Sequence, residues 1–259
     1  MVYFTENDNS KITQVKDIGV LIDRMNALVI EYLESNPGIE KRSKTIIESN
    51  RYILATLSPS FKLRQQQSEI YGLDKSTRGF ESWMAKSVML NVLETTYDRT
   101  KKLLRDRSRE LGSSIDDNPE DYQNAPNTKT TQKLLTRQSE QEELRQQLCS
   151  IAELTIESYE DRIEYLKASS KTEKELAVLL EKFNGNLRPS LIHPLVTIGK
   201  ADFAFDLAEN HRAFSILTEL CTDVNVGSME RIKYYLDMYK EQFGFELYKW
   251  YVENGEFLV

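Results

Sequence analysis

The sequence repeats apolar side chains at steps of three and four residues over long stretches without proline. The longest stretch runs from Phe80 to Leu111, and a second one runs from Leu144 to Leu166. This spacing places the repeated side chains along one face of an α-helix. The positions on that face are Ala85, Met89, Leu93, Tyr97 and Leu104 in the first stretch, and Leu144, Leu148, Ile151, Thr155, Tyr159, Ile163 and Leu166 in the second. We expect two long helices that pack antiparallel as a central hairpin.

Glycine and proline, which interrupt helices, are scarce, because the 259 residues include only 10 Gly and 6 Pro. Hydrophobic residues make up 40% of the chain and charged residues 29%. The length allows one large domain or two ordinary ones with a sizeable core. Together these properties predict a mostly helical chain.

Residues 1–111 are predicted to form N-terminal helical hairpins. A first helix ends before Pro37, and a second helix covers 39–57 and ends at Pro59, because proline restrains the residue that precedes it. A shorter and more polar helix is expected over 60–73, before the long helix described above.

Residues 112–131 are rich in Ser, Asp, Asn, Pro and Thr, and we expect an acidic, polar and mobile loop there. Residues 132–259 are predicted to form a C-terminal helical stack that is continuous with the first part. After Lys171 its expected segments are 172–184, 187–199, 200–210, 212–223 and 228–253. The fold class is therefore all-α, an irregular α-solenoid of stacked antiparallel helical hairpins without a fixed repeat period.

The net charge of −7 argues against a chain-wide surface for nucleic acid. Two cysteines, Cys149 and Cys221, do not indicate a disulfide scaffold and favour a reducing compartment. The polar N-terminus lacks an apolar signal core, and no stretch approaches the ~20 apolar residues that span a bilayer. We expect a chain that is neither secreted nor inserted in a membrane by itself.

The stretch "ADFAFDLAENHRAFSILTELC" at 201–221 gathers acidic residues, one of the two histidines and a cysteine. A zinc site needs three or four ligands at short recurring spacings, which this stretch does not offer. His211 follows Asn210, which tolerates a left-handed backbone, and this order is typical of a helix C-terminus. Cys221 lies on an apolar face. We interpret the cluster as packing and capping.

No other pattern predicts a catalytic, cofactor-binding or metal-binding residue. His193 has no serine, cysteine and acid arrangement around it, and Gly199-Lys200 lacks the upstream glycine of a phosphate loop. The acidic run 116–121 superficially resembles the magnesium-binding box of helical prenyl-transferring enzymes. Pro119 and its polar flanks favour a loop rather than the rigid helix that such a box requires.

Six basic residues crowd the end of the first long helix and are opposed in that span only by Asp106: Arg99, Lys101, Lys102, Arg105, Arg107 and Arg109. They spread around most of the helix circumference, which is typical of a solvated surface. Contact with nucleic acid or an anionic membrane is the alternative.

The C-terminal segment is dense in aromatic residues: Tyr234, Tyr235, Tyr239, Phe243, Phe245, Tyr248, Trp250 and Tyr251. They can pack within the domain, or they can form a surface on which a further repeat or a partner stacks. The ending GEFLV shows no capping signal. We read the chain as part of a longer protein.

Residues 192–255 carry a resemblance to a known family. "GKADFAFDLAENHRAFSILTELC", followed by "MERIKYYLDMYKEQFGFELYKWYVENGE", resembles the helical domain of the nucleoporin 133 family, scaffold components of the Y complex of the nuclear pore. The resemblance implies a structural role in the middle part of that domain. In this family a propeller precedes the helices, and the main partner contact lies further towards the C-terminus, so partner-binding residues of this chain stay unknown.

The resemblance predicts a non-enzymatic structural scaffold of the nuclear pore complex at the nuclear envelope. The chain would be a helical spacer in a Y-complex nucleoporin that supports nucleocytoplasmic transport and mRNA export. Its expected partners are other Y-complex nucleoporins, without a cofactor, a small-molecule substrate, nucleic acid or direct membrane insertion. The alternative is a helical adaptor that binds a protein or peptide partner outside the pore. An enzyme comes third and requires the acidic loop to become ordered around a metal.

Overall fold

The computed structural model describes residues 16–70, 85–116, 128–168 and 173–255, and every regular element within these ranges is a helix. The N-terminal region consists of α1 (Lys16–Ser35), α2 (Ile39–Ile70), α3 (Ser87–Asp116) and α4 (Thr128–Ala168). The C-terminal region consists of α5 (Glu173–Glu181), a π-helical segment η3 (Lys182–Leu187), α6 (Arg188–Thr197), α7 (Ala201–Asn210), α8 (Phe214–Thr222) and α9 (Met229–Glu253). The predicted all-α class is confirmed.

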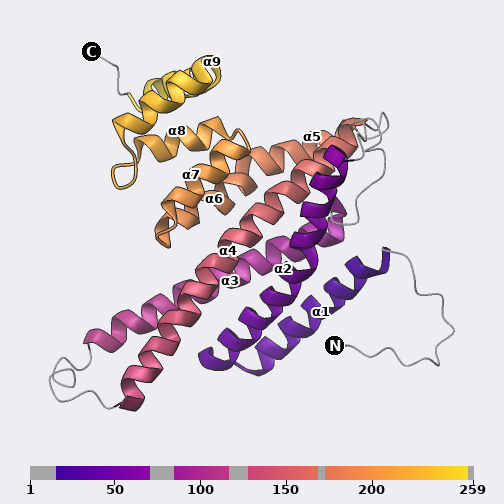
Figure 1. Cartoon of the computed structure of the whole chain (residues 1–259), viewed down its shortest axis with the longest axis vertical. Coiled ribbons are helices and arrows are strands. Elements are labelled where there is room, and N and C mark those ends of the chain that lie inside the picture. Colours follow the sequence, from indigo (N-terminus) through magenta and orange to yellow (C-terminus); the bar gives the residue numbers. More distant parts are fainter. Residues whose placement is uncertain (1–15, 71–84, 117–127, 169–172, 256–259) are drawn as a thin grey trace.

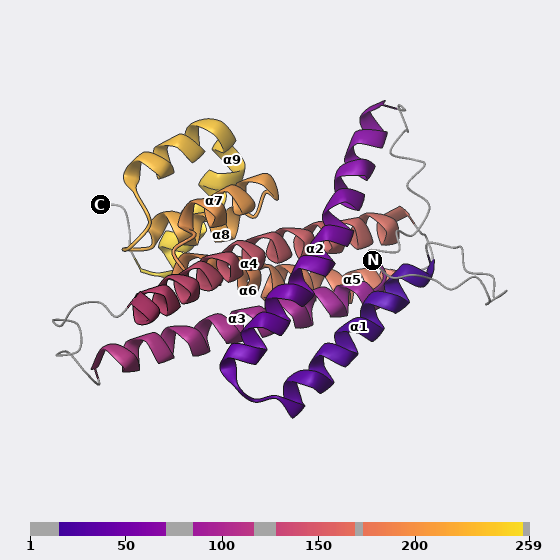
Figure 2. The same cartoon turned by 60° about the horizontal axis from the view of Figure 1, so that its bottom comes forward.

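The helices are stacked in series along an elongated body (Figure 1). Helices α3 and α4 form the expected central antiparallel pair, with α1 and α2 against one side of it and α6 to α9 against the other (Figures 1 and 2). Helix α4 contacts both sides, since it packs on α2, α3, α5 and α6. Beyond it, each helix packs mainly on the next, from α6 to α9.

Two apolar clusters hold this stack together. The larger one extends from Ile46 on α2, through Tyr97 and Tyr159 on the central pair, to Phe243 on α9. The smaller one joins α1, α2 and α3 with Leu154 of α4, and it includes Ile53, which is fully buried. Burying a large apolar side chain stabilises a fold by about 1.5–3 kcal/mol. The continuous larger cluster therefore links the two regions into one body.

Helix α2 does not end at Pro59, and the separate helix expected over 60–73 is instead the second half of α2, which reaches Ile70. Pro59 lies on the exposed side of the helix, whereas Phe61 is buried in the smaller cluster. A proline inside a helix costs about 3 kcal/mol. Burial of Phe61 offsets much of that cost, so the helix continues past the proline.

The predicted loop 112–131 is bordered by helix at both ends, because α3 continues to Asp116 and α4 begins at Thr128. Its centre, 117–127, lies outside the described residues, as do 71–84. The three-part division of the chain stays a prediction.

The short C-terminal segments have nearly the expected bounds, with one refinement. The segment 172–184 is divided between α5 and η3, and the proline-containing segment 187–199 is helical as α6. Pro189 is tolerated because it lies in the first turn, where the backbone N–H has no partner within the helix. Within the described ranges, none of the helices combines the length and the apolar character that a membrane crossing requires.

Candidate interaction surfaces

The predicted capping position of His211 is confirmed, but its side chain also ties two distant helices together. His211 ends α7, and its Nδ1 lies 2.8 Å from a carboxylate oxygen of Glu160 on α4. The other oxygen of Glu160 accepts a hydrogen bond of 2.8 Å from Arg188, at the start of α6. The left-handed residue of this turn is Arg212, with φ 50°, rather than Asn210.

The acidic residues around His211 do not converge on one point. Asp202 accepts a hydrogen bond of 2.7 Å from Arg231, and Glu209 accepts one of 2.8 Å from the hydroxyl of Tyr239, so both carboxylates are directed to α9. Cys221 is buried in the apolar cluster. Among the residues that the structure describes, no group of three or more His, Cys, Asp or Glu side chains is placed to hold a metal ion.

The remaining sequence candidates also act as ties between helices. His193 on α6 lies 2.9 Å from a carboxylate oxygen of Glu219 on α8. Lys200, between α6 and α7, donates a hydrogen bond of 2.7 Å to Glu142 on α4. Of the acidic run, residues 117–121 lie outside the described residues.

The two thiols are buried in the larger apolar cluster. Burial raises the pKa of Cys149 to about 11 and that of Cys221 to about 12. A nucleophilic cysteine needs a stabilised thiolate and therefore a lowered pKa. Both side chains consequently serve as small apolar packing groups.

The basic run at the end of α3 is not a uniformly solvated surface. Arg99 donates a hydrogen bond of 2.9 Å to Asn26 on α1, and burial lowers the pKa of Arg99 to about 10. Arg107 is only 4% exposed and donates to Ser43 on α2 at 2.8 Å and to Glu140 on α4. Two of the six cations therefore belong to the interior of the N-terminal region, where each is paired with polar groups.

A second buried polar contact lies about two helix turns from that of Arg107, in the same region. The side-chain amide of Asn50 on α2 donates to Thr100 on α3 and to Gln147 on α4, both at 2.9 Å. Gln147 in turn donates to the backbone carbonyl of Ile47 at 3.1 Å. Three long helices are thus joined by side-chain hydrogen bonds shielded from water.

The aromatic residues of α9 are divided between the core and the surface, so packing within the domain is confirmed for some of them, and a stacking surface for a further repeat or a partner stays a prediction. Tyr235 and Phe243 are buried, whereas Tyr234, Phe245 and Tyr248 are at least half exposed. The backbone of α9 is non-helical at Lys240, with φ 23° and ψ −90°. This break divides the helix in two.

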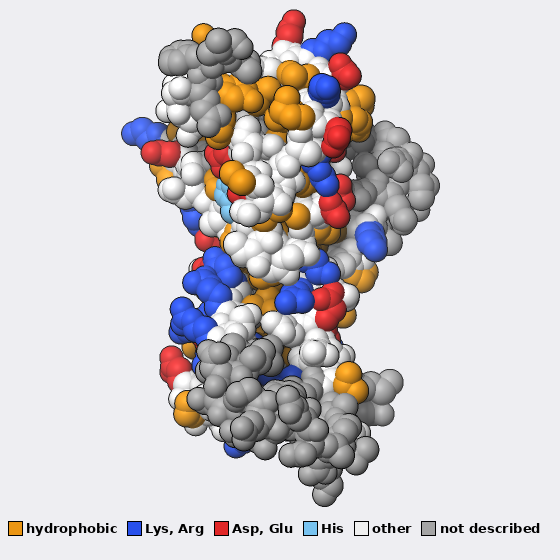
Figure 3. All heavy atoms as spheres, turned by 90° about the vertical axis from the view of Figure 1, so that its left-hand side faces the viewer, with side chains coloured by type: hydrophobic (Ala, Val, Ile, Leu, Met, Phe, Trp, Pro, Cys, Tyr) orange, Lys and Arg blue, Asp and Glu red, His pale blue; other side chains and the backbone are white. Residues whose placement is uncertain are grey.

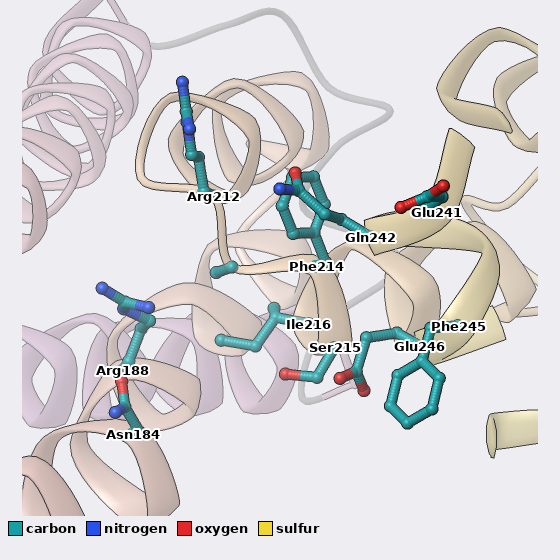
Figure 4. A pocket seen from close by; sticks show the side chains of 11 residues that line it. Asn184, Arg188, Arg212, Phe214, Ser215, Ile216, Glu241, Gln242, Phe245 and Glu246 are labelled. Carbon is teal, nitrogen blue, oxygen red and sulfur yellow. The ribbon is translucent and has the colours of Figure 1, made fainter. Parts of the chain in front are cut away.

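A pocket of about 450 Å³ lies between the second half of α9 and the α7–α8 turn. Arg188 and Arg212 stand on one side of it, and Glu241 and Glu246 stand on the other (Figure 4). Because charges of both signs line the pocket, it offers no net preference for an anion or a cation.

A larger hollow of about 820 Å³ lies between α3, α4 and α6, and we term it the α3–α6 groove. Its basic residues are Lys101, Arg105 and Arg109 on α3 and Arg145 on α4. Its other lining residues are Leu104, Ser108, Gln141, Pro189, Ser190, His193, Pro194, Thr197 and Ile198. Figure 3 shows Lys and Arg side chains gathered at the narrowed middle of the molecule. The lining contains no Asp or Glu, so the groove is suited to an anionic partner.

Known proteins provide an independent comparison for this fold. No family model matches the chain. The protein "Nucleoporin nup132" of Schizosaccharomyces pombe is 26% identical over 217 residues, which cover 81% of this chain and 17% of the relative. "Nuclear pore complex protein Nup133" of Mus musculus is 29% identical over 112 residues, and its Homo sapiens counterpart is 26% identical over 112 residues. Each of these two matches covers 43% of this chain and 9% of the relative.

These relatives confirm the resemblance predicted from 192–255, and the fission yeast match extends the similarity to most of the chain. The chain spans less than a fifth of the length of each of these relatives. What it shares with them is therefore one segment of a much longer protein.

Proposed function

We propose that this Nup133-like chain is a helical spacer in the scaffold of the nuclear pore complex, at the nuclear envelope. It would hold other modules of a Y-complex nucleoporin at a fixed distance and angle, and it would support nucleocytoplasmic transport and mRNA export through the integrity of the pore. Its partners would be other Y-complex nucleoporins, with the main contact C-terminal to this segment. The observation that carries the proposal is that α4 packs on α2, α3, α5 and α6, and that the stack continues from α6 to α9 with each helix packed on the next.

The dimensions of α4 favour a spacer. At 41 residues and a rise of 1.5 Å per residue, this helix is about 60 Å long. Helices on both of its sides share the larger apolar cluster. A load applied at α9 therefore reaches α2 through packed side chains rather than through a flexible linker.

The polar side chains that are candidates for chemistry make contacts between helices, which favours a structural role. His211, His193 and Lys200 each pair with a carboxylate on another helix. The relatives are named as nucleoporins and nuclear pore complex proteins. Both observations support a non-enzymatic chain.

A helical adaptor that works outside the pore is the second candidate, and the exposed aromatic residues of α9 favour it. Phe245 is 66% exposed and Tyr248 is 69% exposed. An apolar helix face at the end of a solenoid suits either the next repeat or a separate partner.

A segment exchange distinguishes the two candidates. The matched segment of fission yeast Nup132 is replaced by this chain, and the fluorescently tagged chimera is compared with a deletion of the segment and with an unrelated helical bundle of the same length. A spacer of the pore should restore the nuclear-rim signal that the deletion loses, better than the unrelated bundle does. A chimera that performs no better than the deletion, although the isolated chain is helical by circular dichroism, would contradict the pore assignment.

Small-angle X-ray scattering tests the spacer geometry separately. A compact domain of this length has a radius of gyration of about 18 Å. We expect a clearly larger value for the monomeric chain. A value near 18 Å would argue for a globular adaptor.

A further inference from the structure

The charge and shape of the α3–α6 groove point to a ligand, independently of the pore assignment. We infer that this groove is a docking site for an acidic segment of another protein, in which Asp or Glu residues alternate with apolar side chains. The carboxylates would pair with the cations on the rim, and the apolar side chains would cover the floor.

The cations on the rim lie in one row along α3. Lys101, Arg105 and Arg109 recur at steps of four, which places them on the same side of the helix. Arg145 on α4 adds a fourth positive charge to the lining. This row provides regularly spaced positive charges, and the planar guanidinium groups of its two arginines are suited to bidentate pairing with a carboxylate.

The absence of acidic residues from the lining contrasts with the composition of the whole chain. The chain carries 41 Asp and Glu against 34 Lys and Arg, for a net charge of −7, yet none of the thirteen lining residues is acidic. Within the described part of the chain, Arg105 is exposed and has no ion-pair partner. The groove is thus a local positive site on a negatively charged molecule.

The ion pairs that the lining residues already make do not block the site. Lys101 pairs with Asp98 at 2.9 Å, Arg145 pairs with Glu142 at 3.5 Å, and His193 lies 2.9 Å from a carboxylate oxygen of Glu219. All three carboxylates lie outside the lining, and their side chains are 70%, 43% and 49% exposed. Exposed pairs of this kind contribute little stability, so a ligand carboxylate can replace or join them.

The floor of the groove favours a peptide over nucleic acid. Leu104, Pro189, Pro194 and Ile198 make up the apolar part of the lining. Apolar side chains of a peptide gain free energy by covering these residues, whereas a phosphate backbone does not. On the opposite side of the row, α3 carries Asp98 and Asp106 in a second hollow of about 370 Å³. A polyphosphate that followed the cations around α3 would meet these carboxylates.

The test measures binding of a fluorescein-labelled peptide, in which Glu and Asp alternate with Leu, by fluorescence anisotropy against the whole chain. Two further probes are a peptide with Ser in place of each Leu and a short labelled DNA duplex. We expect the Glu/Leu peptide to bind most tightly, and its affinity to fall as salt is raised.

Substitutions distinguish peptide binding in the groove from nonspecific attraction to the charge of the molecule. Arg105→Glu should weaken peptide binding by about tenfold or more, since hydrogen bonds to charged groups are lost and a repulsion is introduced. Ile198→Ser should weaken the Glu/Leu peptide and leave the Glu/Ser peptide unchanged. Lys102→Glu is the matched control, because it makes the same charge change on α3 at a residue outside the lining. It should alter binding by less than about threefold. Thermal unfolding of each variant verifies that it is folded.

Several outcomes would overturn the proposal. They are the absence of peptide binding by the unaltered chain, equal loss in the Arg105→Glu and Lys102→Glu variants, and equal affinity for the two peptides. Tighter binding of the DNA duplex would assign the site to nucleic acid. A dimer in sedimentation that Arg105→Glu dissociates would assign the groove to a second copy of this chain.

Discussion

The N-terminal and C-terminal regions hold their helices together by different means. Between α1 and α4, the interfaces include buried hydrogen bonds such as those of Asn50 and Arg107. Between α6 and α9, the interiors are apolar and aromatic, and the charged ties lie at the edges, as for the pair of Arg231 with Asp202. The polar contacts are thus internal in one region and peripheral in the other.

The lengths of the helices explain this difference. Helices α2, α3 and α4 have 32, 30 and 41 residues, and a displacement by one turn would again match apolar rows with apolar rows. A buried polar pair disfavours such a displacement, because the displaced groups lose their partners. Helices α6 to α8 have nine or ten residues, and the turns that end them fix their alignment. Long helices therefore need internal polar markers of register, and short ones do not.

The largest effect is expected in the apolar C-terminal region. Phe243 is fully buried, and Phe243→Ala should lower the free energy of unfolding by about 3–5 kcal/mol, since it creates a cavity. Urea denaturation followed by circular dichroism measures the change. Phe245→Ala is the matched control on the same helix, at a ring that is 66% exposed, and should change stability by less than about 1 kcal/mol. Equal losses would show that apolar packing does not dominate there.

In the N-terminal region, Asn50→Leu should lower the free energy of unfolding by about 2 kcal/mol. The substitution removes the donor for the buried oxygen of Gln147 while it keeps the side-chain volume nearly constant. Urea denaturation provides the value. A neutral result would mean that register in this region is set by apolar packing alone, and the contrast between the regions would disappear.

The boundary between the two regions should respond to pH. Burial, and next the neighbouring Glu153, raise the pKa of Glu157 on α4 to about 7 in the folded chain, above its usual value. The folded state therefore favours the protonated form. The stability that this preference contributes is complete below the pKa of the unfolded chain and is lost as pH rises through about 7.

Unfolding measured from pH 5 to pH 8 should show a decrease of about 1–2 kcal/mol, as expected from the difference in proton binding. Glu157→Gln should flatten this dependence, because the amide does not ionise. Glu173→Gln, at an exposed position on α5, serves as the control and should leave the dependence intact. An unchanged slope in Glu157→Gln would assign the pH dependence to other groups.

The smallest effect is expected at a peripheral tie. Asp202→Asn removes the ion pair between Asp202 and Arg231. The side chain of Asp202 is 89% exposed in this pair. Exposed ion pairs contribute about 0–1 kcal/mol, so the change in the free energy of unfolding should stay below about 0.5 kcal/mol. Thermal unfolding at low and high salt measures it. A loss comparable to that of Asn50→Leu would erase the distinction between internal and peripheral polar contacts.

The positions of most helices could be predicted because apolar spacing is a local property of the sequence. The end of α2 was predicted wrongly at Pro59, because the local preference of proline is outweighed by burial of Phe61 against other helices. The position of His211 at a helix end followed from its neighbours, but its partner Glu160 is 51 residues away and gave no local signal.

The inward direction of Arg99 and Arg107 could not be predicted either, because their partners Asn26 and Ser43 lie on other helices and far away in the sequence. The two residues are eight positions apart on one face, but so are Lys101 and Arg109, which line the α3–α6 groove. Only the polar partners contributed by other helices distinguish the two rows. The groove itself combines segments from α3, α4 and α6, and its existence depends on how these helices pack.

The packing of α4 on helices of both regions predicts the order of local unfolding in this molecule. Because α4 packs on helices of both regions, its central amides can exchange with solvent only when both regions separate from it. Helix α9, whose main neighbour is α8, can detach while the rest of the stack stays closed. Hydrogen exchange should therefore be slowest in the middle of α4 and faster along α9.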